Sequence, residues 1–106
     1  ASLRFVSYAK HGFMKSHSDR VSFVDGHETN TSFVLYLGSG VDAEAPPGAV
    51  VEGDTVFLGA GDEDKLRVAP TCGSALLFPH RLRHRGDVVG AAGKLILRAE
   101  VLVMEV

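Results

Sequence analysis

The chain has 106 residues, of which 45% are hydrophobic, and this is enough for one small domain with a buried core. Its formal net charge is −2 with both signs interspersed, which excludes the strongly basic surface typical of nucleic-acid binding. No apolar run approaches the ~20 residues of a membrane-spanning helix, and the opening residues indicate a strand rather than a signal peptide. The single Cys72 cannot form an internal disulfide, which favours a reducing compartment such as the cytoplasm or nucleus.

Short β-rich runs separated by Gly, Asp, Pro and Ser follow one another along the chain, with no amphipathic helical pattern among them. They predict eight strands, at 3–8, 13–19, 21–24, 32–37, 55–58, 66–69, 75–78 and 95–106, with 85–89 as a further candidate. Residues 38–53 and 59–64 are rich in glycine and acidic side chains, and we expect surface loops there. Short strands without helices predict an all-β sandwich, jelly roll or small barrel, and closure is favoured because it removes exposed sheet edges.

His17-Ser18-Asp19 is the first candidate for chemistry. In a strand, residues i and i+2 point to the same face, so an imidazole and a carboxylate at this spacing can bind one metal ion. His84 is the best candidate for a third ligand, and His80 is its rival. Two histidines and one carboxylate leave three positions open and suit Fe(II). The alternative is a surface pair in a polar turn, which is common for an isolated His-x-Asp triplet.

Lys94 stands at the start of the last predicted strand, and by alternation it shares one face with Ile96 and Arg98. Alternation favours a solvated face. The other interpretation is that one of these cations pairs with the carboxylate of a bound acid. Tyr36 lies in an apolar run, so its phenol either contacts a ligand or reaches a backbone carbonyl in the core.

Further motifs accompany His17-Ser-Asp19 in chain order. They are Leu3-Arg-Phe-Val-Ser-Tyr8, Gly53-Asp-Thr-Val-Phe57, Pro70-x-x-Gly73-Ser-Ala-Leu-Leu-Phe78, His84-x-Gly86-x-x-Val89 followed by Lys94, and Leu97-Arg-Ala-Glu-Val101. In this order they resemble the prolyl 4-hydroxylase-like group of Fe(II)- and 2-oxoglutarate-dependent oxygenases. Asp54 stands where that family usually has Glu, and Gly93 lies one residue later than its glycine, while Lys94 keeps its distance from His84.

The resemblance implies a double-stranded β-helix, a jelly-roll barrel of the cupin type, for residues 1–106. It also implies that the chain is a catalytic core without the N-terminal helices that support the larger sheet in relatives. Such a core should expose an apolar patch, fold less stably than a longer form and self-associate. The loop at 38–53 would be a lid.

The function that the resemblance implies is hydroxylation of a substrate C–H bond by an Fe(II)- and 2-oxoglutarate-dependent dioxygenase. His17, Asp19 and His84 would bind Fe(II). Lys94 would bind the far carboxylate of 2-oxoglutarate, with Tyr8 or Tyr36 donating a hydrogen bond and Arg98 near by. The further partners are dioxygen, ascorbate as a candidate cofactor, and a prolyl peptide, another protein or a small molecule as substrate.

Two other classes stay open at this point. One is a cupin-like metal enzyme without oxygen chemistry, which would need no lysine at the start of the last strand. The other is a non-catalytic binding module on the same fold, which would be expected to lack a metal ligand. We expect substitution of His17, Asp19 or His84 by alanine to abolish metal binding, and substitution of His80 to spare it.

Overall fold

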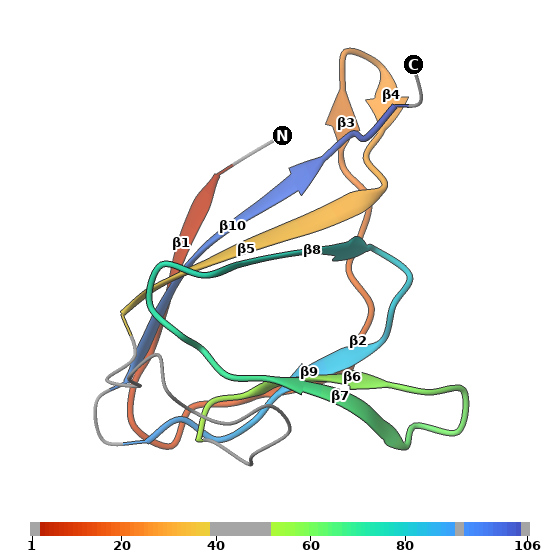
Figure 1. Ribbon diagram of the computed structural model, residues 1–106. Helices are drawn as coiled ribbons and strands as arrows, with labels where there is room; N and C mark the ends of the chain where they lie inside the picture. Colours follow the sequence, from red (N-terminus) through yellow and green to blue (C-terminus); the bar gives the residue numbers. More distant parts are fainter. Residues whose placement is uncertain (1–2, 39–51, 91–92, 105–106) are drawn as a thin grey trace.

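The computed structural model describes residues 3–38, 52–90 and 93–104. These residues form ten β-strands and no helix, and the strands make two four-stranded antiparallel sheets and one small hairpin. The two sheets face each other, and the hairpin projects beyond one end of them (Figure 1). The predicted all-β class is therefore confirmed, and the two facing sheets are the layers of a double-stranded β-helix. Within the described ranges, no helix is long and apolar enough to cross a membrane.

The first sheet has the strand order β1-β10-β5-β8, and the second has the order β2-β9-β6-β7. The first sheet consists of β1 (Arg4–Tyr8), β10 (Lys94–Val101), β5 (Thr31–Gly38) and β8 (Ala75–Pro79). The second sheet consists of β2 (Met14–His17), β9 (His84–Gly86), β6 (Thr55–Leu58) and β7 (Asp64–Val68). The hairpin consists of β3 (Phe23–Val24) and β4 (His27–Glu28). Apart from β6 and β7, neighbouring strands in each sheet are far apart in sequence, so most of the fold depends on long-range pairing.

Alternation along β5 and β10 separates an inner face from an outer face of the first sheet. Val34, Tyr36 and Ile96 are buried on the inner face, where they join Phe57 and Phe78 in the hydrophobic core. Side chains at every second position share a face, so Lys94 and Arg98 point inward with Ile96. The interpretation of this face as solvated is therefore wrong, because the facing sheet covers it.

The outer face of the first sheet is apolar. One row of Cα partners crosses all four strands, and it consists of Phe5, Leu97, Leu35 and Ala75. Phe5 and Leu77 are 72% and 67% exposed. The described residues thus leave an apolar patch on this face.

Several strand boundaries differ from the predicted ones. Strand β2 ends at His17, so Asp19 follows the strand instead of closing it. The candidate strand at 85–89 is instead β9, and the backbone beyond Gly86 leaves the ladder because Val88 and Val89 bond to Gly53, His11 and Gly12. Strand β4 lies where no strand is predicted. The expected lid at 38–53 lies mostly outside the described residues, because 39–51 are not among them.

Candidate metal centre

His17 and His84 are direct Cα partners on the neighbouring strands β2 and β9. Their ring centroids are 4.4 Å apart, and the two rings are tilted by 56°. Asp19 follows β2 by two residues, and its Oδ1 atom lies 3.3 Å from Nε2 of His17 and 3.6 Å from Nε2 of His84. The candidate ligand atoms of these three residues all lie within 4.8 Å of one another.

Main-chain hydrogen bonds fix the orientation of both imidazoles. Nδ1 of His17 lies 2.7 Å from the carbonyl oxygen of Lys15, and Nδ1 of His84 lies 3.0 Å from that of Leu82. A carbonyl can only accept, so each Nδ1 carries the proton and donates. In the neutral ring, each Nε2 then has a lone pair directed at the cluster, which is the tautomer that a metal ion requires.

The ionisation of the cluster suits a cation. Burial lowers the pKa of His84, and the hydrogen bond to Leu82 and the Asp19 carboxylate only partly oppose this, so the ring stays neutral near pH 7. Burial by itself would raise the pKa of Asp19, but the Ser32 hydroxyl, His84 and Arg98 together lower it. Two imidazoles and one carboxylate are a mixed nitrogen and oxygen donor set that fits Fe(II) and leaves further coordination positions open.

Ser32 and His80 hold the Asp19 side chain from the far side. The Ser32 hydroxyl donates to Oδ2 of Asp19 at 2.5 Å. Nδ1 of His80 therefore donates to Ser32 at 2.8 Å, and Nε2 of His80 accepts from the Thr29 hydroxyl at 2.8 Å. Both nitrogens of His80 are occupied, so His80 belongs to the support of the cluster and not to its ligand set.

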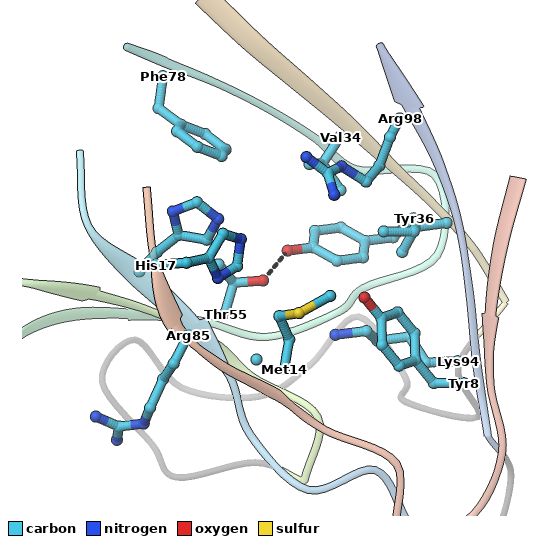
Figure 2. A pocket seen from close by; sticks show the side chains of 13 residues that line it. Tyr8, Met14, His17, Val34, Tyr36, Thr55, Phe78, Arg85, Lys94 and Arg98 are labelled. Carbon is cyan, nitrogen blue, oxygen red and sulfur yellow. Dashed lines mark hydrogen bonds between the residues drawn. The ribbon is translucent and has the colours of Figure 1, made fainter. Parts of the chain in front are cut away.

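A small pocket extends from the cluster between the two sheets. It is lined by Tyr8, Met14, His17, Val34, Tyr36, Thr55, Phe78, His84, Arg85, Gly86, Lys94, Ile96 and Arg98, and its free volume is about 40 Å³. Figure 2 shows Arg98, Tyr36, Tyr8 and Lys94 reaching into it from one side, with His17 and Thr55 on the other. The tyrosines and cations that were candidates for cofactor binding thus lie in the same pocket as the metal-ligand candidates.

Lys94 is buried in this pocket. Its Nζ donates to the carbonyl oxygen of Gly53 at 3.1 Å and lies 4.9 Å from the centre of the Tyr8 ring. Among the described residues, no carboxylate lies within ion-pair distance of Nζ. Burial lowers the pKa of Lys94, opposed only in part by the more distant Asp54 and Asp87. A buried cation of this kind favours an incoming carboxylate.

Two glycines lie close to Lys94, Gly93 in sequence and Gly86 in space. Gly93 has a φ of 73°, and a Cβ there would lie 2.9 Å from the carbonyl oxygen of Tyr8. A Cβ on Gly86 would lie 3.4 Å from Cβ of Met14 and 3.8 Å from Nζ of Lys94. The later position of Gly93 in the motif therefore matches a left-handed turn directly before β10.

The two tyrosines differ in their surroundings. Tyr36 is fully buried, and its hydroxyl lies 2.6 Å from the Thr55 hydroxyl. Burial raises the pKa of Tyr36 to about 12. Tyr8 is half-buried, and burial also raises its pKa. Both phenols stay protonated at neutral pH and can donate a hydrogen bond to an anion in the pocket.

Sequence reasoning missed Ser32, Thr55 and the role of His80. Ser32 shares its strand face with Val34 and Tyr36, so a polar residue at a core-facing position was the available signal. Nothing in the local sequence indicated the partner of Arg98. Its Nη2 atom donates to Oδ1 of Asp19 at 3.2 Å, although 79 residues separate the two.

Comparisons with known proteins place the fold. No protein-family model matches the sequence, and no curated protein matches it. Among solved structures, the crystal structure of a Pseudomonas putida prolyl-4-hydroxylase matches with a TM-score of 0.68 and 22% sequence identity. The match covers 96% of this chain and 52% of that chain, so this chain spans about half the length of the similar structure. The resemblance drawn from the motifs is thereby confirmed at the level of the double-stranded β-helix fold.

Proposed function

We propose that this chain is the core of an Fe(II)- and 2-oxoglutarate-dependent dioxygenase that hydroxylates a substrate C–H bond. The observation that carries the proposal is the position of Lys94. A buried ammonium group without a carboxylate partner among the described residues lines the same pocket as the His17–Asp19–His84 cluster. A ligand that has both a metal-chelating end and a distant carboxylate satisfies both features at once.

His17, Asp19 and His84 would hold the iron through two Nε2 atoms and one carboxylate oxygen. Bound there with 2-oxoglutarate and dioxygen, iron supplies the oxidising power that converts C–H to C–OH while 2-oxoglutarate is split to succinate and CO₂. Lys94 would bind the far carboxylate, and the Tyr8 hydroxyl would add a hydrogen bond. Phe78 lies 4.9 Å from the His84 ring, centre to centre, and limits the access of water to this side of the cluster.

The substrate class is the least constrained part of the proposal. The similar structure is described as a prolyl-4-hydroxylase, which makes a prolyl residue in a peptide or protein the first candidate. Succinate release in the presence of Fe(II), 2-oxoglutarate and pools of proline-containing or other peptides would identify the substrate. A pool that raises succinate release several-fold over the rate without peptide would contain the substrate.

The function itself is tested by titrating the protein with Mn(II) in the presence and absence of 2-oxoglutarate. We expect Mn(II) binding that His17→Gln abolishes, and 2-oxoglutarate binding that requires Mn(II). Metal binding with no effect of 2-oxoglutarate would instead favour a cupin-like metal enzyme without this chemistry. Absence of metal binding would favour a non-catalytic module.

A further inference from the structure

Arg98, which is paired with Asp19, lines the pocket but has no role in the proposed function. Nη2 of Arg98 donates to Oδ1 of Asp19, which is the same oxygen that faces both imidazoles. The other oxygen, Oδ2, is held by Ser32. Arg98 therefore contacts the candidate metal-binding atom directly, whereas Ser32 leaves that atom accessible.

With a divalent cation bound, the pocket would carry more positive than negative charge. The Asp19 carboxylate is the only acidic side chain in the cluster, and Lys94 and Arg98 are two cations on the same inner face of β10. The Asp19 side chain is 3% exposed and that of Arg98 is 21% exposed, so solvent screens their interaction with a third charge only in part. A divalent cation thus competes with the guanidinium for Oδ1 and is also repelled by it.

The position of Arg98 on β10 gives it a second use. Lys94 and Arg98 are four residues apart on one strand, or about 13 Å at ~3.3 Å per residue, and both side chains line the pocket. Lys94 lies at one end, near Gly53, and Arg98 lies at the other end, beside the cluster. A dicarboxylate bound between them would meet one cation at each end. A guanidinium can form two parallel hydrogen bonds to a carboxylate, which makes it suitable for the end near the metal.

We propose that Arg98 couples metal binding to dicarboxylate binding by exchanging Asp19 for the metal-side carboxylate of the ligand. This inference rests on the proposed function and assigns a role to a residue that is not a metal ligand. In the absence of ligand, Arg98 occupies Asp19 and weakens metal binding. When the dicarboxylate arrives, Arg98 pairs with it, and the repulsion between the guanidinium and the metal is relieved. Metal and dicarboxylate then each raise the affinity for the other by the same factor.

The test measures Mn(II) binding alone, and 2-oxoglutarate binding with and without Mn(II), by isothermal titration calorimetry. The variants are Arg98→Gln, which removes the charge at similar length, and Arg98→Lys, which keeps it. Arg83→Gln is the matched control, because it removes an exposed guanidinium that pairs with Asp62 on the surface. Thermal unfolding of each variant checks that the fold is retained.

For Arg98→Gln, we expect Mn(II) alone to bind about threefold to tenfold more tightly, and 2-oxoglutarate in the presence of Mn(II) to bind about tenfold more weakly. Arg98→Lys should stay close to the parent protein in Mn(II) affinity, and Arg83→Gln should change neither quantity. These opposite changes distinguish the exchange from structural damage, which would weaken both.

Weaker binding of Mn(II) to Arg98→Gln would overturn the inference and would mean that Arg98 only positions Asp19. Unchanged binding of both ligands would overturn it as well, while the parent protein's response to 2-oxoglutarate would still support the dioxygenase. A parent protein that binds no Mn(II) would refute the dioxygenase and this inference together.

Discussion

The ammonium group of Lys94 donates a hydrogen bond to the carbonyl oxygen of Gly53, so a cation from the last strand is bound by the segment that leads into β6. Gly53 is in turn hydrogen-bonded to the segment that follows β9, because its N–H donates to the carbonyl oxygen of Val88. Three segments that are distant in sequence thus fix the far end of the pocket before any ligand is bound.

The substitution Lys94→Met should weaken 2-oxoglutarate binding and at the same time stabilise the apo protein. Removing the charge should weaken 2-oxoglutarate binding by about 100-fold or more, since loss of one partner of a buried charge pair costs ~3–5 kcal/mol. Mn(II) affinity should not fall. The apo protein should become more stable by about 1 kcal/mol, because a buried cation is replaced by an apolar side chain of similar length. Calorimetry measures both affinities, and thermal unfolding measures the stability. Unchanged 2-oxoglutarate affinity would remove Lys94 from the binding site.

Ser32→Ala should weaken Mn(II) binding without removing a ligand. The Ser32 hydroxyl orients Asp19 through Oδ2, and loss of such an outer partner typically costs about 10–100-fold in metal affinity. Ser32→Thr keeps the hydroxyl and should restore most of the affinity. Ser74→Ala is the control, because its hydroxyl bonds to Thr71 away from the cluster. Equal affinities in the parent and Ser32→Ala proteins would show that Asp19 is positioned by its backbone alone.

His80→Ala should retain measurable Mn(II) binding, whereas His17→Ala, Asp19→Ala and His84→Ala should each abolish it. His80 contacts Asp19 only through Ser32 and through its own carbonyl oxygen, which accepts from the Asp19 N–H at 2.9 Å. We expect a moderate loss of affinity and a lower unfolding temperature, since Thr29 and Ser32 lose a buried hydrogen-bond partner. Titration of all four variants under one condition decides the ligand set. Complete loss of binding in His80→Ala with retention in His84→Ala would exchange their roles.

The pKa of His84 predicts how stability changes in acid. Its folded-state pKa lies below the ordinary value of 6.5, so the unfolded chain binds more protons at this residue than the folded protein does. The contribution of His84 to the free energy of unfolding is therefore fully present above pH 6.5, and it falls as the pH drops from there toward the folded-state pKa. Metal affinity should fall over the same range, because the ligand must be neutral. Urea unfolding between pH 5 and 8 measures this, and His84→Asn should flatten the slope.

Alternation in the sequence located β5 and β10 as strands, but it favoured the wrong face of β10 as the solvated one. The buried inner face carries Lys94 and Arg98 beside Ile96, whereas the apolar Leu97 lies on the outer face. The metal-ligand candidates followed from the spacing of His17 and Asp19 and from the motif that joins His84 to Lys94. These signals are local, so they can be recognised in the sequence without knowledge of the fold.

Other features depended on pairing between distant segments and could not be predicted. Strand β7 begins at Asp64, two residues earlier than predicted, and Asp64 there forms an ion pair with Arg85 of β9. Arg98 and Asp19 are brought together only when β10 is placed against β5. The difference between His80 and His84 likewise depends on Thr29 and Ser32, which lie about fifty residues earlier in the chain.

The orientation of the two imidazoles in the candidate metal centre depends on carbonyl oxygens of the main chain, at Lys15 and at Leu82. Every amino acid supplies the same carbonyl, so the chemistry of the centre places no demand on the side chains at these two positions. Lys15 is exposed and is therefore open to almost any replacement, whereas Leu82 is restricted only by its packing against the core. A combinatorial library at position 15 can thus alter the surface charge at this position of β2 without removing the carbonyl that orients His17.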